Sequence, residues 1–374
     1  NTPVAADKER RRISRRDGDR VTTCSVSPGM FQTAAYGYRG HVKLLMDPPL
    51  PHAHGPISFA LIEQLQQRAP RHWLSRLDVP LADADPYGLD LQLALYVCYE
   101  LHYRGFAHVD ARWEWDGGLL HLRGQLEQIF LSAVRRDVRA TDAGADEAMA
   151  ALSVEHVDSW GPSHFLRERG TWEQMREYFV HRSLYHLKEG DPHAWAIPRL
   201  TGQAKASFVA VEFDEFGGGA GARIHQQLFA DLLIAADLDP TYLGYLHHVP
   251  AVSLAPVNLM SMFGLHRALR GAAVGHFAAT EITSSPGSQR LAAALRRLGA
   301  PAACVAFYDE HVEADAVHEQ VVRNDVVGDL VANAPHLEAD VVFGIQAFEL
   351  VEDRLAAHLM KRWDAGRSSL RRPL

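Results

Sequence analysis

The 374-residue sequence contains little cysteine, and its three cysteines, Cys24, Cys98 and Cys304, follow no regular spacing. This scarcity argues against a disulfide framework or a cysteine-based zinc module and predicts a reducing cytoplasm as the compartment. Basic residues are also in the minority, because the formal net charge is −8. A nucleic-acid partner is therefore not expected, since such proteins carry a basic surface.

Long apolar runs are missing as well, and the longest uncharged stretches fall well short of a membrane span. No membrane partner is expected. The arginine-rich residues 10–16 are followed by charged residues and lack the apolar segment of an export signal. Residues 1–30 are accordingly predicted to form a disordered tail.

The sequence does have helical periodicity along most of its length. Apolar residues make up 47% and charged residues 22%, which is ordinary for a globular protein. Prolines, Pro286 among them, fall between the periodic segments and predict helix boundaries. The predicted fold class is an all-α bundle, with helices at residues 57–68, 91–101, 118–138, 172–188, 202–216, 222–236, 253–270, 289–298, 304–327 and 339–363.

The most informative pattern lies between residues 311 and 318. His311, Asp315 and His318 stand at positions i, i+4 and i+7 of a predicted helix, so all three side chains share one face. Two imidazoles and a carboxylate on an inward face form a ligand set that suits iron, or less specifically zinc or manganese. This helix is therefore predicted to carry part of a metal site.

Three more residues are predicted to face the interior. Glu215 ends a mostly apolar segment, where an acid is costly unless it is paired or bound to a metal. Residues 217–219 are glycines that break this helix, and His225 begins the next helix on the face of its apolar stripe. Glu281 is an isolated acid in a stretch of apolar and small residues.

The six candidates supply three carboxylates and three imidazoles from four segments. Two ferrous ions would nearly balance the carboxylate charge, as a buried site requires. One metal ion rarely takes six protein ligands if it must also bind oxygen, whereas two ions with three each keep open positions. A two-metal site is therefore predicted.

With these residues, the chain resembles the haem-oxygenase-like di-iron oxidases and oxygenases, a family of iron-containing redox enzymes. The similar stretches are residues 188–200, 214–219, 224–229 and the helix with His311, with residues 99–106 resembling an upstream helix. The resemblance covers roughly residues 90 to 363. It implies a haem-oxygenase-like multi-helix bundle with an N-terminal helical extension, and its ligand positions fall on the six residues.

A subset of this family hydroxylates amine or guanidine nitrogen and has an additional glutamate on a preceding helix, for which Glu189 is the candidate. The resemblance implies two Fe(II)/Fe(III) ions as cofactors, O₂ as co-substrate and a peroxo-diferric intermediate. The expected enzyme is a non-haem di-iron oxidoreductase that oxygenates a nitrogen of an amine, guanidine or amino acid in natural-product biosynthesis. Its expected partners are a small-molecule substrate, an external electron donor and a second copy in a homodimer.

Other functions stay open at this point. The same scaffold could perform desaturation, oxidative decarboxylation or C–C cleavage of a small acid or amino acid. A non-catalytic bundle that binds haem or a metal is a further alternative, although one axial histidine would leave Asp315 and His318 unused. A ferritin-like oxidase usually shows two Glu-x-x-His motifs, and here only Asp315-x-x-His318 comes close.

The sequence also predicts how the chain is divided and which residues support the ligands. The domain at residues 116–366 would hold the iron, residues 31–115 would form a helical region suited to dimerisation, and residues 367–374 would form a tail. The side chains expected to orient ligands or line a pocket are Asp214, Glu212, His276, Tyr185 and Tyr308.

Overall fold

The computed structural model describes residues 47–68, 79, 81–154 and 160–374. Helices dominate these residues, and no strand occurs among them, which confirms the predicted all-α class. The predicted tail at residues 1–30 lies outside the described residues.

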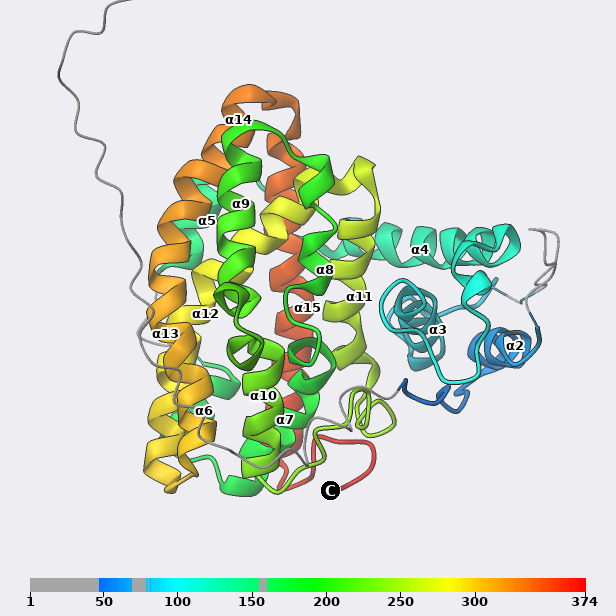
Figure 1. The fold of residues 1–374 in the computed structure, drawn as a ribbon, viewed down its shortest axis with the longest axis horizontal. Coiled ribbons are helices and arrows are strands. Elements are labelled where there is room, and N and C mark those ends of the chain that lie inside the picture. The colour runs from blue at the N-terminus through cyan, green and yellow to red at the C-terminus, as the bar shows by residue number, and fades with distance from the viewer. Residues whose placement is uncertain (1–46, 69–78, 80, 155–159) are drawn as a thin grey trace, which may run out of the picture. The chain divides into compact units, whose positions relative to one another are not determined.

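Helices of bundle length carry most of the fold (Figure 1). Several shorter helices were not predicted, because segments of four to eight residues show too few turns for a clear period; they are α5 (Ala145–Leu152), α6 (Pro162–Glu168), α8 (Asp191–Ala194) and α14 (Asp329–Asn333). The predicted helices appear as α2 (Pro56–Leu65), α3 (Leu89–Glu100), α4 (Gly117–Asp137), α7 (Trp172–His186), α9 (Gly202–Glu215), α10 (His225–Ala235), α11 (Ala251–Leu265), α12 (Arg270–Leu298), α13 (Ala302–Val321) and α15 (Glu338–Asp364).

Helix α12 is the centre of the bundle and packs along both α13 and α15. Its approach to α15 depends on two glycines. A Cβ on Gly275 would collide with the carbonyl of Val341, and a Cβ on Gly344 would collide with the carbonyl of Ala272. The two backbones therefore touch directly, which leaves the opposite face of α12 to meet α13 and the candidate metal site.

Pro286 lies inside α12, so the predicted helix boundary at this residue is wrong. Proline removes one backbone donor and usually bends or ends a helix, but the long contacts of α12 with its neighbours hold it together here. The prolines at 162, 250 and 301 do stand at helix starts, as predicted. The consequence is that residues 270–298 form one continuous helix, which carries Glu281 in its middle.

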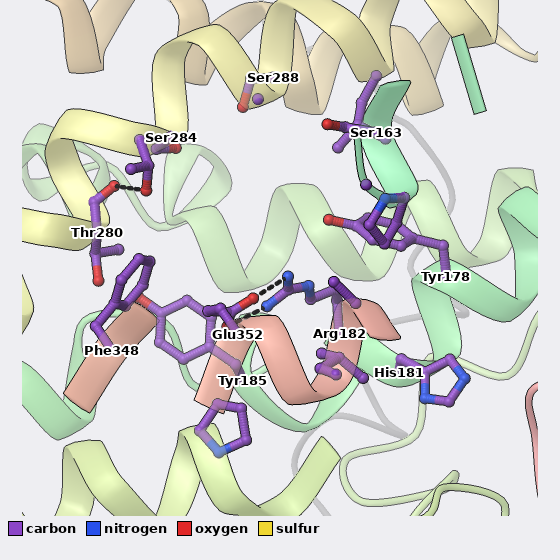
Figure 2. Close-up of a pocket in the computed structure, with 18 of the residues that line it drawn as sticks. Ser163, Tyr178, His181, Arg182, Tyr185, Thr280, Ser284, Ser288, Phe348 and Glu352 are labelled. Carbon is purple, nitrogen blue, oxygen red and sulfur yellow. Dashed lines mark hydrogen bonds and ion pairs between the residues drawn. The ribbon is translucent and has the colours of Figure 1, made fainter. Parts of the chain in front are cut away.

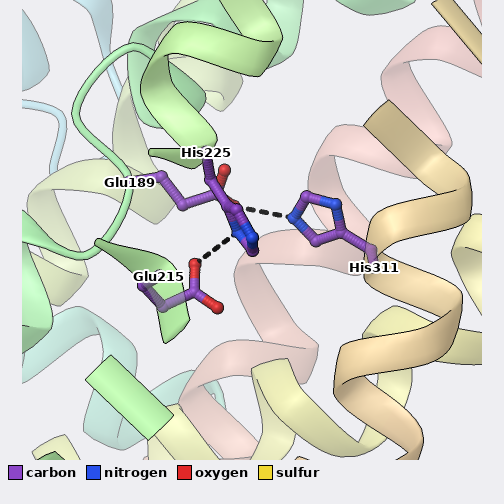
Figure 3. Close-up of side chains that lie close together, drawn as sticks. All are labelled: Glu189, Glu215, His225 and His311. Atoms are coloured by element: carbon purple, nitrogen blue, oxygen red, sulfur yellow. Dashed lines mark ion pairs between the residues drawn. The ribbon is translucent and has the colours of Figure 1, made fainter. Parts of the chain in front are cut away.

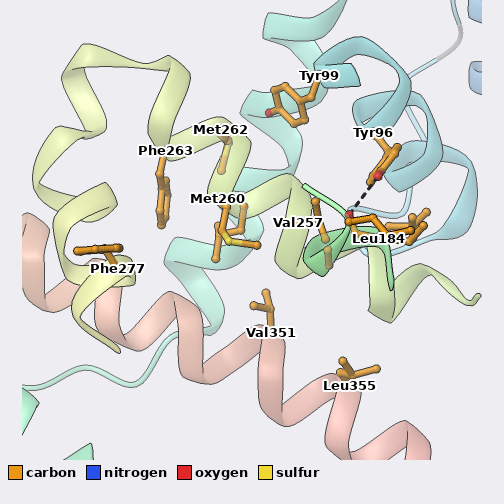
Figure 4. Packing of buried hydrophobic residues seen from close by; sticks show 14 of the residues in the cluster. Tyr96, Tyr99, Leu184, Val257, Met260, Met262, Phe263, Phe277, Val351 and Leu355 are labelled. Carbon is orange, nitrogen blue, oxygen red and sulfur yellow. Dashed lines mark hydrogen bonds between the residues drawn. The ribbon is translucent and has the colours of Figure 1, made fainter. Parts of the chain in front are cut away.

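Helix α3 joins the N-terminal helices to the bundle. Every residue from Leu91 to Glu100 is buried, and the helix packs against α11 and α4. The hydroxyl of Tyr96 donates a hydrogen bond to the carbonyl of Leu184 in α7 at 3.3 Å (Figure 4). A helix that is apolar all round is expected to be buried in this way.

The last residues of the chain are held against α7 and α15. Ser369 is buried, and its hydroxyl donates to Glu177 Oε2 at 2.6 Å and lies 2.9 Å from His181 Nε2. The carbonyl of Ser369 lies 2.8 Å from His358 Nε2. The segment predicted as a tail at residues 367–374 thus contacts the helices through Ser369. Among the described helices, none has the length and apolar character that a membrane crossing requires.

Candidate metal centre

Seven buried side chains meet between α7, α9, α10, α12 and α13. They form two groups, and within each group one ligand atom per residue lies within 4.8 Å of the others. Glu215 belongs to both groups. The first group is Glu189, Glu215, His225 and His311 (Figure 3), and the second is Glu215, Glu281, Asp315 and His318.

The first group is assembled from the ends of helices. Glu189 lies in the turn between α7 and α8, Glu215 is the last residue of α9, and His225 is the first residue of α10. Only His311 comes from the middle of a helix, α13. Figure 3 shows the four side chains converging from these separate segments.

Glycine makes the connection between Glu215 and His225 possible. Gly217 has φ +70°, and a Cβ there would lie 2.6 Å from the backbone nitrogen of Ile224. Only glycine adopts this left-handed conformation with so little room beside it. The chain therefore turns sharply after α9 and begins α10 with His225 beside Glu215, where His225 Nδ1 lies 2.8 Å from Glu215 Oε2.

The second group is set mainly by helical periodicity. Asp315 and His318 lie one turn apart on α13, and Glu281 faces them from α12. His318 Nδ1 lies 3.1 Å from Glu281 Oε2 and 3.4 Å from Asp315 Oδ1. These contacts place one imidazole and three carboxylates in a single buried pocket of ligand atoms, once Glu215 is included.

Several atoms of these groups lack a hydrogen-bond partner although they are buried. They are Glu189 Oε2, His225 Nδ1, His311 Nε2 and Asp315 Oδ2. Buried polar atoms are nearly always hydrogen-bonded, and leaving them without a partner costs free energy. The contact between His225 and Glu215 is short but lacks hydrogen-bond geometry. Both observations fit atoms that are arranged to bind cations, and imidazole with carboxylate suits iron.

Neighbouring groups orient both histidines of α13. His311 Nδ1 donates to the carbonyl of Phe307 at 2.7 Å, so Nε2 points into the first group. His318 Nε2 lies 3.1 Å from Asp214 Oδ2, so Nδ1 faces the second group. A partner on the outer nitrogen fixes the ring and raises the basicity of the inner one, as is usual for histidines that bind metals.

Charges within the first group perturb its pKa values strongly. Burial lowers the pKa of His311, but the carboxylate of Glu189, with those of Asp315 and Glu215, outweighs it and raises the pKa to about 10. Burial raises the pKa of Glu189, but His186 and His311 outweigh it and hold the pKa below its usual range. His186 Nδ1 lies 2.8 Å from Glu189 Oε1. Without a metal ion, protons occupy the places that a cation would take.

The second group shows the same competition. Burial raises the pKa of Glu281 to about 8, with Asp315 and Glu215 adding to the shift and the contact with His318 opposing it. Burial lowers the pKa of His318, but Asp315, Glu281 and Asp214 outweigh it and raise the pKa to about 11. Carboxylates crowded this closely repel one another, and a cation would relieve that repulsion.

A cavity of about 620 Å³ reaches the first group, because Glu189 and His311 form part of its wall. Tyr185 and Thr280 also line it, and the ion pair between Arg182 and Glu352 faces it (Figure 2). This pair is bidentate, with N–O distances of 2.8 Å and 2.6 Å. The cavity therefore joins a candidate metal site to a polar wall that a small molecule could contact.

Residues 176–353 match the model of the iron-containing redox enzyme family, whose fold is haem-oxygenase-like. This region belongs to that family. The match confirms the predicted resemblance and supports an iron-dependent oxidoreductase, and all seven predicted ligands lie inside the matched region. A comparison with curated proteins gave no match.

The structure brings all seven predicted ligands into the two groups. That they bind metal stays a prediction. Of the predicted supporting residues, Asp214 contacts His318, while Tyr185, His276 and Tyr308 line the cavity. Glu212 is buried one turn before Glu215, and neither of its carboxylate oxygens has a hydrogen-bond partner.

Sequence reasoning missed several polar residues around the site. Arg182 and Glu352 are far apart in the sequence, so their ion pair gave no local signal. His186 follows the period of α7 without standing out. Glu100 did carry a signal, because it is the one acid in the apolar run 91–101, and it pairs with Lys188 beside Glu189.

Proposed function

We propose that this protein is an O₂-activating di-iron oxygenase that oxygenates a nitrogen atom of an amine, guanidine or amino acid. The observation that carries the proposal is the pair of buried ligand groups sharing Glu215. Two adjoining groups suit two ions, with one carboxylate able to contact both. Four carboxylates, from Glu189, Glu215, Glu281 and Asp315, would neutralise two ferrous ions.

Glu189, Glu215, His225 and His311 would hold one iron ion, and Glu215, Glu281, Asp315 and His318 the other. When bound and reduced, the ions supply the electrons that activate O₂. The chain supplies geometry and exclusion of water. The carbonyl of Phe307 and the carboxylate of Asp214 keep the two imidazoles of α13 turned toward their groups.

Glu212 supports the same centre from one turn away on α9. Its carboxylate is buried, and burial, with the nearby charges of Glu215 and Glu281, raises its pKa well above the usual range. Glu212 Oε2 also lies close to Gly190, beside the turn that carries Glu189. In the metal-free chain this carboxyl group is therefore held in its neutral form beside the turn that carries Glu189.

The cavity favours a polar, basic substrate over a fatty acid. Glu349, Glu352 and Asp353 line it from α15. Burial raises the pKa of Glu349 and of Asp353, and repulsion from Asp353 and from Glu352, respectively, adds to each shift, while Arg139 opposes both. A cationic amine or guanidine would offset this repulsion, whereas an acyl chain would leave the carboxylates in a drier and less favourable setting.

The experiment that tests the proposed function is aerobic turnover of the iron-loaded protein with a panel of amines, guanidines, amino acids and fatty acids. Mass spectrometry separates the outcomes, because N-oxygenation adds one oxygen atom and desaturation removes two hydrogens. We expect oxygen addition with basic substrates. Products that have lost two hydrogens or CO₂ would support the alternative chemistry on the same scaffold.

The predicted partners belong to this proposal too. An external electron donor must reduce the iron between turnovers. A homodimer through residues 31–115 is also proposed, in which a second copy would cover the exposed side chains of Phe59 and Trp115, now 59% and 54% exposed. Sedimentation of the full chain, compared with a variant that carries Phe59→Asp and Trp115→Asp, would test the dimer.

A further inference from the structure

An ion pair in the interior joins α3 to the turn that carries Glu189. Lys188 Nζ lies 2.9 Å from Glu100 Oε2, and the two side chains are only 1% and 0% exposed. Burying two charges is costly, and the pair is stable only where further contacts satisfy both groups. Such a pair is weak evidence for stability alone, so a specific role needs a structural reason.

Both charged groups are well supplied with such contacts. The hydroxyl of Tyr242 lies 2.9 Å and 3.0 Å from the two carboxylate oxygens of Glu100. The ammonium group of Lys188 stands over the rings of Tyr96 and Tyr103, 4.4 Å and 4.6 Å from their centroids. Aromatic faces attract cations most strongly where water is excluded. Lys188 is thus fixed in a cage that belongs mainly to α3 and the turn after it.

This fixation matters because the backbone beside Lys188 is not held by regular helix bonds. Helix α7 ends at His186, and Gly190 has φ +83°. Glu189 N donates to the carbonyl of His186 at a long 3.4 Å. His186 Nδ1 contacts the Glu189 carboxylate at 2.8 Å, but the position of the backbone that carries this side chain depends on contacts from outside the turn.

A second set of hydrogen bonds, here called the second tie, connects the turn of Glu189 to the segment that follows α3. Gln226 Nε2 donates to the carbonyl of Glu189 at 2.9 Å, and Arg104 Nη2 donates to Gln226 Oε1 at 3.2 Å. The guanidinium of Arg104 stacks over the ring of Tyr242 at 4.1 Å. Tyr242 is also the hydroxyl partner of Glu100, so the two ties form one connected network.

We propose that Glu100 and Lys188 are positioning residues for Glu189, so that helix α3 is part of the scaffold of the first ligand group. This inference rests on the proposed function, since it assumes that Glu189 binds a metal ion. The second group does not share this dependence. Its remaining ligands lie on α12 and α13, which pack against each other.

The test measures metal affinity in two backgrounds that isolate the groups. His318→Ala leaves the first group intact, and His311→Ala leaves the second. Each is combined with Glu100→Gln, and anaerobic Fe(II) binding is followed by calorimetry. We expect Glu100→Gln to weaken binding at least about tenfold in the His318→Ala background, as loss of a supporting group typically does. In the His311→Ala background the affinity should stay unchanged.

The control is Glu127→Gln, which alters another buried carboxylate, in α4. Glu127 accepts from Tyr99 at 3.1 Å and contacts His266 at 2.9 Å, with no tie to the turn of Glu189. The double variant Glu100→Gln/Lys188→Met leaves no unpaired charge, so it keeps the test valid if a single variant fails to fold. Like Glu100→Gln, it should bind Fe(II) weakly at the first group only. Equal weakening at both groups, weakening by Glu127→Gln, or no weakening would overturn the inference.

The readout also separates this inference from the proposed function. Metal binding is measured without O₂ or substrate, so it reports on Glu100 and Lys188 even if the protein oxygenates no nitrogen. If the unaltered chain binds no iron at the first group, the proposed function fails first. If it binds iron there and Glu100→Gln changes nothing, only the positioning role fails.

Discussion

The two ligand groups sit side by side but are built in different ways. In the first group, three of the four residues lie at helix ends or in a turn: Glu189, Glu215 and His225. In the second group, Glu281, Asp315 and His318 all lie inside the long helices α12 and α13. A ligand within a helix is placed by the helix itself, whereas a ligand in a turn needs support from elsewhere.

This difference predicts which substitutions will disturb each ligand group. The second group should tolerate changes in distant elements, because the packing of α12 on α13 sets its geometry. The first group depends on the glycine turn at Gly217 and on the buried contacts of Lys188. Substitutions that separate the two groups are therefore the most informative.

The largest effect is expected where the groups overlap. Glu215→Ala removes the one residue common to both, so tight binding of both iron ions should be lost while the helical circular dichroism is kept. Iron content after anaerobic loading and desalting provides the measurement. Two ions retained per chain would show that Glu215 is not shared.

His311→Ala and Asp315→Ala form a matched pair, one turn apart on the same helix. Each should reduce the iron content from two ions per chain to one, and activity should be lost in both. In His311→Ala the remaining ion should be sensitive to Asp315→Ala but not to His225→Ala. An unchanged iron content in both variants would contradict the proposed centre.

A smaller effect is expected at the outer edge of the second group. Asp214→Asn removes the charge that orients His318 from 3.1 Å. Loss of such a partner typically lowers metal affinity about 10–100-fold, and here the loss should be confined to one of two binding steps in a calorimetric titration. Asp231→Asn, on the exposed face of α10, is the control and should leave both steps unchanged.

The smallest effect concerns a buried histidine outside the centre. His181 lies between the hydroxyls of Ser253 and Ser369, at 2.7 Å and 2.9 Å, and burial lowers its pKa to about 3. The folded chain keeps this ring neutral, while the unfolded chain protonates it near its ordinary pKa of about 6.5. Its contribution to stability is thus full above about pH 6.5 and is lost as the pH falls toward 3.

The histidines of the metal centre change the stability with pH in the opposite direction. The pKa values of His311 and His318 are raised to about 10 and about 11, so their contribution is full below about pH 6.5 and is lost only as the pH rises through those values. Urea unfolding of the metal-free protein between about pH 7 and pH 4 should therefore lose a few kcal/mol through His181. His181→Gln should make this slope less steep without abolishing it, because burial also lowers the pKa values of His193 and His276. An equally steep slope in the variant would rule out the assignment.

The fold and the second group could be predicted from the sequence because both follow helical periodicity. His311, Asp315 and His318 share a face at fixed spacing, and an acid such as Glu281 stands out in an apolar stretch. Glu189 was predicted only from the family resemblance, because a residue in a turn is not part of a periodic helical pattern. The pairing of Glu100 with Lys188 joins residues 88 positions apart, and no local pattern encodes such a contact. The helix boundary predicted at Pro286 was wrong because the packing of α12 against its neighbours outweighed the local tendency of proline to end a helix.

The most direct test of the account is anomalous diffraction at the iron edge from crystals of the protein loaded anaerobically with Fe(II). The account predicts two iron peaks per chain, one among Glu189, Glu215, His225 and His311, and the other among Glu215, Glu281, Asp315 and His318. A single peak, or iron bound away from Glu215, would contradict it.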